Sequence, residues 1–203
     1  MYSPPHYQEG NPEEARRIIR ENPFGILFSQ SQDGPVATHI PFMLEEAEDG
    51  LGTLIGHMAR ANPQWNSWTE QTELLIVFPG PHAYISPGWY ANPKNVPTWN
   101  YLSVHAYGSP RLTEDPDRLN EMVEKLTGEY EKGDRWDTEQ GKHNRERMLR
   151  AIVGFEIPIS RWEAKRKLNQ NKTAEDRRGV IQALEDSGYS VSQQVADEMK
   201  RLK

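Results

Sequence analysis

The sequence contains no cysteine, which excludes several kinds of chemistry. A chain without thiols forms no disulfide, holds no thiolate-bound metal and has no cysteine nucleophile. Any redox chemistry would therefore need a bound cofactor. The chain also lacks a run of roughly 18 apolar residues, which a membrane-spanning helix requires. Its first residues lack the basic and apolar regions of a signal peptide, so we expect a cytoplasmic protein that does not associate with membranes.

Apolar residues are scarce for a domain of this length. They make up 35% of the 203 residues, and the mean hydropathy is -0.85. One core is feasible at this size, and no internal repeat indicates more. We therefore predict a single domain over residues 1–203, with residues 173–203 as a C-terminal helical extension. Because burial within one chain would be lean, a homodimer interface is expected to supply further apolar contacts.

A concentrated basic region is also missing. The formal net charge is -6, and the 24 Lys and Arg residues are spread along the chain apart from clusters at residues 145–150 and 161–172. Duplex DNA binding usually shows a concentrated basic footprint, because affinity comes largely from displacing counterions at phosphates. The composition therefore gives little support for direct DNA binding and leaves it open.

Several functional motifs are absent. There is no G-x-G-x-x-G and no Walker loop, which argues against Rossmann and P-loop nucleotide sites. The six histidines show no tight ligand spacing, so no metal site is predicted. No Ser-His-Asp order or G-x-S-x-G elbow is found, and the catalytic residues stay unassigned.

The pattern of apolar residues predicts strands with helices at the margins. Strands are expected at residues 24–30, 36–44, 51–58, 74–78, 98–112 and 153–164, with an ordered loop that contains brief extended pieces over 79–97. Helices are expected after Asn11, after Asp115, over 139–151 and after Thr173, followed by a short, frayed helix over 191–202. About six strands joined mostly by hairpins, without βαβ alternation, predict a mainly β (α+β) fold: an antiparallel barrel with peripheral helices.

The segment Gly56–Trp65 is a candidate phosphate pocket. It combines a strand end, the cationic side chain of Arg60 and a helix start at Asn62-Pro63. Free N–H groups at a helix start favour an anion, and the Arg fork suits phosphate oxygens. The alternative is an ordinary strand-to-helix turn with Arg60 in solvent.

The strand at Val36–Leu44 is the second candidate. A backbone that passes the edge of a flat heteroaromatic ring can match its donors and acceptors through its own N–H and C=O groups. Thr38 and His39 would then lie next to the ring, with His39 pointing away from the apolar row of the strand. A structural, hydrogen-bonded histidine is the competing interpretation.

Two aromatic segments and one basic loop complete the set. Gly80–Tyr90 and Val96–Tyr101 are rich in aromatic residues, which either plug a barrel end or wall a planar ligand site. The loop Lys165–Lys172 mixes cations with amides and could close a site on an anionic ligand across a subunit boundary. A solvated basic loop is equally consistent with it.

Taken together, these segments resemble the PaiB-like family of FMN-binding negative transcriptional regulators, within the wider pyridoxamine-phosphate-oxidase-like group of split barrels. The matching pieces run in order over nearly the whole chain: ATHIPFML, GHMARANPQW, FPGPHAYISPGWY, VPTWNY, IVGFEIPISRWEAK and KLNQNKTAEDR. The resemblance implies an antiparallel split β-barrel of the FMN-binding type, forming a homodimer with FMN in clefts between the subunits.

The resemblance also implies roles for individual residues. Thr38, His39 and Ile40 would line the edge of the isoalloxazine ring, and Arg60, Ala61 and Asn62 would hold the phosphate. His57 and Met58 would lie between them, and Lys167 and Gln170 would arrive from the partner subunit. In the closing loop KLNQNK, the family pattern has Ser before Gln170 and Arg at Lys172, and loss of the Arg fork weakens a bidentate contact.

Three functions follow as expectations. The first is a flavin-dependent or flavin-sensing negative transcriptional regulator that holds FMN at the dimer interface. The second is an FMN-dependent oxidoreductase acting on a small molecule, with the protein supplying orientation and electrostatics. The third is a split barrel that binds haem through one of its histidines.

Overall fold

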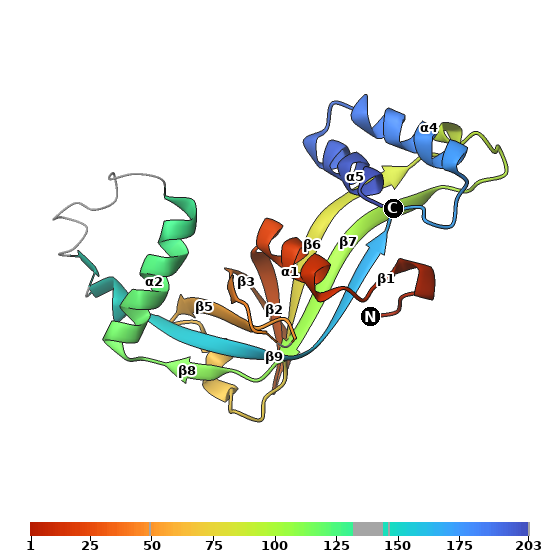
Figure 1. Ribbon diagram of the computed structural model, residues 1–203. Helices are drawn as coiled ribbons and strands as arrows, with labels where there is room; N and C mark the ends of the chain where they lie inside the picture. Colours follow the sequence, from red (N-terminus) through yellow and green to blue (C-terminus); the bar gives the residue numbers. More distant parts are fainter. Residues whose placement is uncertain (49, 132–143, 146, 203) are drawn as a thin grey trace. The chain divides into compact units, whose positions relative to one another are not determined.

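The computed structural model describes residues 1–48, 50–131, 144–145 and 147–202 (Figure 1). The chain divides into two compact units. Unit 1 comprises residues 1–21, 79–105 and 163–203, and unit 2 comprises residues 22–78 and 106–162. Three long strands contribute residues to both: β6 (Leu74–Ile85), β7 (Thr98–Gly108) and β9 (Ile152–Lys167).

The strands form one sheet in the order β3-β2-β6-β7-β9-β5-β4. The remaining members of that path are β2 (Phe24–Ser31), β3 (Gly34–Pro41), β4 (Met43–Glu45) and β5 (Thr53–Ala59), while β1 (Gln8–Glu9) and β8 (Arg111–Thr113) pair with β9. Antiparallel registers include Ile26 opposite His39 and His57 opposite Gly154. The mainly β, antiparallel prediction is confirmed.

The helices begin where the capping residues predicted them. The α-helices are α1 (Pro12–Glu21), α2 (Pro116–Tyr130), α4 (Ala174–Glu185) and α5 (Ser190–Lys200), and short 3-10 helices are η1 (Pro5–Tyr7), η2 (Pro63–Ser67) and η3 (Pro87–Trp89). Asp115 Oδ1 accepts from Arg118 N at 2.9 Å, and Thr173 Oγ1 accepts from Asp176 N at 3.1 Å. These bonds satisfy amides that have no partner within the helix.

Four local predictions were wrong. The predicted strand 36–44 is interrupted at Phe42, after which Met43–Glu45 pairs with β5. The centroid of the Phe42 ring lies 5.6 Å from that of Phe78. The predicted strand 98–112 is broken at Ser109-Pro110, because proline lacks the amide that a ladder needs. Strand β6 continues to Ile85, so the first part of the predicted loop 79–97 is strand.

The fourth wrong prediction concerns the C-terminal helix. Helix α5 is packed rather than frayed: Val195, Ala196 and Met199 are fully buried within unit 1. The expected helix over 139–151 lies partly outside the described residues; residues 144–145 and 147–149 are helical.

The core of unit 2 is an aromatic and aliphatic cluster between strands. Phe42, Phe78 and Phe155 are buried, and the rings of Phe42 and Phe155 lie 6.2 Å apart. Gly56 leaves room for this cluster, since a Cβ there would come within 2.8 Å of the Phe155 ring. The alternation of buried and exposed positions along β2 follows from this one-sided burial.

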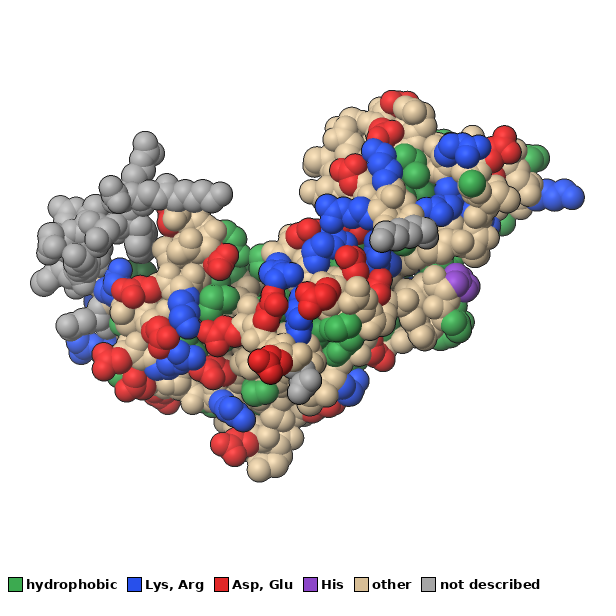
Figure 2. All heavy atoms as spheres, viewed as in Figure 1, with side chains coloured by type: hydrophobic (Ala, Val, Ile, Leu, Met, Phe, Trp, Pro, Cys, Tyr) green, Lys and Arg blue, Asp and Glu red, His purple; other side chains and the backbone are tan. Residues whose placement is uncertain are grey.

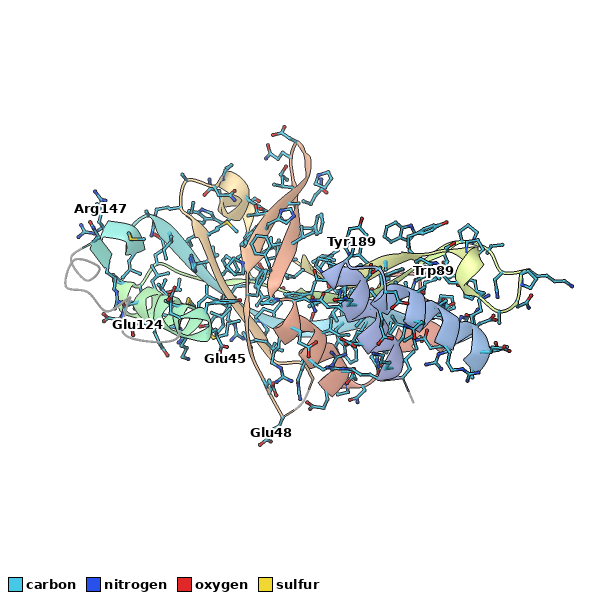
Figure 3. All side chains as sticks on the ribbon, turned by 90° about the horizontal axis from the view of Figure 1, so that it is seen from above. Glu45, Glu48, Trp89, Glu124, Arg147 and Tyr189 are labelled. Carbon is cyan, nitrogen blue, oxygen red and sulfur yellow. The ribbon has the colours of Figure 1, made fainter. Side chains whose placement is uncertain are left out.

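Unit 1 is held together by helices and a buried ion network. Arg17 Nη1 and Nη2 each lie 2.8 Å from the Glu198 carboxylate, which joins α1 to α5. Arg166 of β9 lies 3.2 Å from Glu9 and 3.6 Å from Glu198. Helix α4 packs on η3, where a Cβ at Gly179 would meet the carbonyl carried by Trp89 at 2.2 Å (Figure 3).

Candidate functional site

Two of the predicted site segments are joined by hydrogen bonds in unit 2. Asn62 Nδ2 donates to Thr38 Oγ1 at 3.1 Å, and Asn62 Oδ1 accepts from Gln64 N at 3.0 Å. The Thr38 hydroxyl in turn donates to Gln64 Oε1. The strand expected to follow the ring edge and the turn expected to hold the phosphate are therefore fixed to each other.

Gln64 is the buried centre of this connection. It is only 4% exposed, and its Nε2 lies 3.0 Å from Ser29 Oγ and 3.3 Å from the Leu27 carbonyl. A buried amide with its donors and acceptor engaged fixes its neighbours in one arrangement. We did not single out Gln64 from the sequence, although its place two residues after the Asn62 cap was the available signal.

Arg60 is held rigidly at the end of β5. Its Nε donates to the Arg150 carbonyl at 2.9 Å and its Nη2 to the Ile152 carbonyl at 3.0 Å. The remaining terminal nitrogen, Nη1, forms an ion pair with Glu114. The guanidinium is thus oriented by two carbonyls and presents its third nitrogen to a carboxylate on a half-exposed surface.

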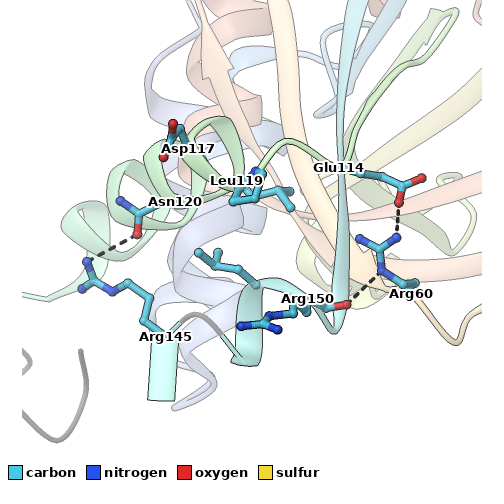
Figure 4. Close-up of a pocket in the computed structure, with 9 residues that line it drawn as sticks. Arg60, Glu114, Asp117, Leu119, Asn120, Arg145 and Arg150 are labelled. Carbon is cyan, nitrogen blue, oxygen red and sulfur yellow. Dashed lines mark hydrogen bonds and ion pairs between the residues drawn. The ribbon is translucent and has the colours of Figure 1, made fainter. Parts of the chain in front are cut away.

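Arg60 also lines a cavity of about 800 Å³ within unit 2 (Figure 4). The other lining residues come from the α2 region and residues 145–150: Glu114, Pro116, Asp117, Leu119, Asn120, Arg145, Leu149 and Arg150. Arg145 Nη1 bonds to Asn120 Oδ1 at 3.4 Å and to Glu124 Oε1 at 2.5 Å. The lining combines arginines and leucines with the carboxylates of Glu114 and Asp117, so an anionic ligand with apolar parts would compete with carboxylates for the arginines.

The other residues of the predicted phosphate turn do not line this cavity. Ala61 is exposed, and the Asn62 side chain is used within the protein. The predicted helix start is the five-residue 3-10 helix η2, so a helix dipole adds little there. Of the three turn residues, Arg60 is therefore the one that could bind an anion.

The ring-edge strand presents two different faces. Ile40 is buried at 2% exposure, whereas His39 is exposed on the opposite face, as the alternation predicted. The His39 ring lies 6.0 Å from the ring of Phe24, which is 59% exposed. An imidazole and a phenyl ring are thus both accessible on the outer face of β2 and β3.

His57 and Met58 lie on β5, adjacent to the turn. His57 is opposite Gly154, so its side chain shares the face of that glycine. A Cβ at Gly154 would come within 2.7 Å of Leu119 and 2.8 Å of Met122, which shows that α2 covers this face. Burial lowers the pKa of His57, so its neutral form is favoured. Met58 is buried in the core at 5% exposure.

Lys167 and Gln170 belong to unit 1 and are also engaged within it. Lys167 Nζ donates to Thr98 Oγ1 and, at 2.8 Å, to the Trp99 carbonyl. Gln170 Oε1 accepts from Leu168 N at 2.8 Å, and its Nε2 donates to the Arg166 carbonyl. Burial lowers the pKa of Lys167, with a smaller contribution from Lys165. Gln170 thus shapes the closing loop from within.

The described residues contain no cluster of three or more His, Cys, Asp or Glu side chains that could hold a metal ion. Among the helices in this part of the chain, none has both the length and the apolar character needed to cross a bilayer.

Comparison with protein families identifies the relatives of this chain. Residues 1–161 match a family model described as "Putative FMN-binding domain". Protease synthase and sporulation protein PAI 2 of Bacillus subtilis (strain 168) is 36% identical over 203 residues, covering 98% of this chain and 97% of that protein. An uncharacterized protein of Aspergillus fumigatus is 32% identical over 237 residues, with 91% of each chain covered.

Comparison with solved structures identifies the fold. The conserved hypothetical protein Rv2991 of Mycobacterium tuberculosis matches with a TM-score of 0.61 at 13% identity, covering 85% of this chain and 94% of that one. The FAD and haem binding protein of Mycobacterium smegmatis matches with a TM-score of 0.58 at 15% identity, covering 85% and 78%. At such identities the likeness concerns the fold, which is the predicted split barrel. The chain therefore belongs to the PaiB-like family of FMN-binding split-barrel proteins, and FMN is its cofactor.

Proposed function

We propose that the chain is a flavin-dependent or flavin-sensing negative transcriptional regulator, which holds FMN with Arg60 at the phosphate. The observation that carries this assignment is the environment of Arg60. Two carbonyls orient its guanidinium, and its Nη1 already holds an anion, the carboxylate of Glu114. Arg60 Nη1 could donate one charged hydrogen bond to an FMN phosphate oxygen in place of the Glu114 carboxylate.

The remaining predicted residues take roles around this anchor. Thr38, His39 and Ile40 run along the ring edge, with the Thr38–Asn62 bond keeping strand and turn together. His57 and Met58 belong to β5 and lie between the ring edge and the phosphate. Lys167 and Gln170 reach the site from the partner in a homodimer, as the family resemblance implies. Bound FMN would supply electron-transfer chemistry, while the protein binds and orients it.

The regulatory part of the proposal is supported by the relative PAI 2, whose name connects it with protease synthesis and sporulation. On the described part of the face in Figure 2, Lys and Arg side chains are interspersed with Asp and Glu. Such mixing gives no concentrated footprint for duplex DNA on that face. We therefore infer that regulation depends on the redox state of the flavin or on a protein partner, and not on direct DNA binding. A salt-dependent gel shift with promoter DNA would contradict this.

The test begins with an absorbance spectrum of the purified protein and an FMN titration. We expect a flavin spectrum, or uptake of added FMN, and the Arg60→Ala variant should bind FMN more weakly by about 1.5–3 kcal/mol, the range for a lost charged hydrogen bond. Arg111→Ala, which removes an exposed arginine of β8, is the matched control. Equal affinity in the two variants would remove Arg60 from the phosphate site.

The same spectrum tests haem as the alternative ligand. Two of the solved structures of this fold carry haem-related names, the FAD and haem binding protein and the flavocytochrome Anf3 of Azotobacter vinelandii. A Soret band in the purified protein, without flavin absorbance, would favour the haem hypothesis. Bleaching of bound flavin by NAD(P)H together with turnover of an acceptor would favour the oxidoreductase hypothesis.

A further inference from the structure

The ion pair of Arg60 and Glu114 connects two junctions of the chain within unit 2 (Figure 4). Arg60 follows β5 and is held by residues 150–152: besides the two bonds of its side chain to carbonyls, its backbone N–H donates to the Ala151 carbonyl at 2.8 Å. Glu114, by contrast, lies between β8 and α2. The pair therefore joins the β5–β9 side of the sheet, which is fixed by bonds to the backbone, to the start of α2.

The β8–α2 junction, defined as residues 114–117, is exposed. Its link to α2 is Asp115, whose side-chain oxygen accepts from the Arg118 N–H at 2.9 Å and whose carbonyl accepts from the Leu119 N–H at 2.9 Å. Because Glu114 directly precedes this capping residue, a change in the position of Glu114 acts on both bonds. The amides of Arg118 and Leu119 are therefore sensitive to the state of the junction.

The body of α2 is anchored separately from the junction. Leu119 and Met122 are buried, and a Cβ at Gly154 of β9 would come within 2.7 Å and 2.8 Å of their side chains. Lys125 pairs with Glu45 of β4 at 2.8 Å. These contacts do not involve Glu114, so α2 keeps its place on the sheet when the carboxylate leaves Arg60. A change at Glu114 is thereby confined to the junction.

An arriving phosphate competes with Glu114 for one nitrogen. Arg60 Nε and Nη2 already donate to carbonyls, which leaves Nη1 for an anion. In the proposed function this anion is the FMN phosphate, and the present inference rests on that assignment. Asp117 also lines the cavity beside Arg60. A phosphate next to Glu and Asp side chains repels them, because all of these groups are negatively charged. Since Arg60 is held by backbone carbonyls, Glu114 is the partner that moves.

We propose that the Arg60–Glu114 pair is a switch through which FMN occupancy controls the β8–α2 junction. Without FMN, Glu114 is bound to Arg60 and the junction is held. With FMN, the phosphate takes Nη1 and Glu114 is released. A flavin-sensing regulator requires a segment that differs between these two states, because a ligand shifts an equilibrium only through such a difference. The junction is this segment, and the size of the shift is limited to the worth of one exposed ion pair.

Amide hydrogen exchange, measured by NMR with and without saturating FMN, tests the switch. The Arg118 and Leu119 amides should exchange about 1.4- to 5-fold faster in the FMN-bound protein, the ratio for loss of one exposed ion pair. A bound ligand stabilises the folded state and so slows exchange or leaves it unchanged elsewhere, which makes acceleration at these two amides specific. The Glu131 amide, bonded to the Thr127 carbonyl at the far end of α2, is the internal control and should not accelerate.

The Glu114→Gln variant removes the charge that the phosphate displaces. Its Arg118 and Leu119 amides should exchange at the faster rate already without FMN, and FMN should change that rate little. Glu73→Gln, which removes the similarly exposed partner of Arg161, should keep the full response to FMN. An acceleration by FMN that is as large in Glu114→Gln as in the unmodified protein overturns the proposal, since another part of the ligand then moves the junction.

The outcomes separate this inference from the proposed function. Circular dichroism and melting temperature establish that Glu114→Gln is folded, which the 56% exposure of the Glu114 side chain favours. If FMN binds and Arg60→Ala weakens its binding, but the two amides exchange equally with and without FMN, the switch is absent although the phosphate site stands. If FMN does not bind, or binds equally to Arg60→Ala, the proposed function fails and this inference fails with it.

Discussion

The guanidinium of Arg60 is paired with the carboxylate of Glu114, a residue 54 positions further along the chain. The pair lies at the rim of the cavity in unit 2, with Arg60 and Glu114 side chains 34% and 56% exposed (Figure 4). A ligand phosphate at Arg60 must therefore displace or share this carboxylate. Competition between an internal and an external anion has a measurable consequence.

Replacing Glu114 by glutamine should strengthen FMN binding. The neutral amide competes less strongly for Arg60 Nη1, and exposed ion pairs are worth about 0.2–1 kcal/mol, so the Kd should fall by less than tenfold. Isothermal titration with FMN measures the change. Glu73→Gln removes the similarly exposed partner of Arg161 and should leave the Kd unchanged. Weaker binding in Glu114→Gln would mean that the carboxylate positions Arg60 for the phosphate.

Replacing Gln64 by leucine should lower both stability and FMN affinity. The substitution leaves the Thr38 and Ser29 hydroxyls without their buried partner, and an unsatisfied buried polar group costs about 1–3 kcal/mol. Urea denaturation gives the free energy of unfolding. Gln71→Leu alters an exposed glutamine and is the control. A stability loss without any change in FMN affinity would separate the Thr38–Asn62 link from the cofactor site.

Acidification should destabilise the fold through His57. Because burial lowers its pKa in the folded state, the unfolded state binds the proton more tightly. Stability contributed by neutral His57 is complete above the ordinary histidine pKa of about 6.5 and is lost as the pH falls through its lowered folded value. Melting temperatures between pH 8 and pH 5 should show a smaller loss for His57→Gln. The exposed His6→Gln variant should keep the full loss.

Replacing Glu198 by leucine should destabilise unit 1. Glu198 is 5% exposed and pairs with Arg17 and Arg166; without it, Arg17 would keep Glu14 and Glu21, and Arg166 would keep Glu9. Because these partners remain, we expect a loss below the roughly 3–5 kcal/mol that an uncompensated buried charge costs, and above that of the exposed control. Asp197→Leu, one position earlier on the exposed side of α5, is the control and should change stability by less than 1 kcal/mol. Equal unfolding midpoints would show that the network adds no net stability.

Local sequence signals predicted much of the fold. Asn11, Asp115 and Thr173 precede helices because their side chains can cap free amides, a preference that acts over a few residues. Prolines and period-two alternation predicted the first hairpin and β9. Alternation could not show that β6 continues through Pro79 and Pro81. A strand tolerates two prolines only where the neighbouring strand does not need their missing amide donors, and the sequence does not say which strand is the neighbour.

The sequence by itself determined the family and its FMN cofactor, the antiparallel fold, and the residue types that can meet a phosphate and a flat ring. Only the tertiary structure decided how those residues are used. It bonded both Asn62 and Gln64 to Thr38, paired Arg60 with Glu114, and joined Lys167 to the Trp99 carbonyl. These partners lie far apart in the chain, and which side chains meet depends on strand register and packing, for which local patterns carry no signal.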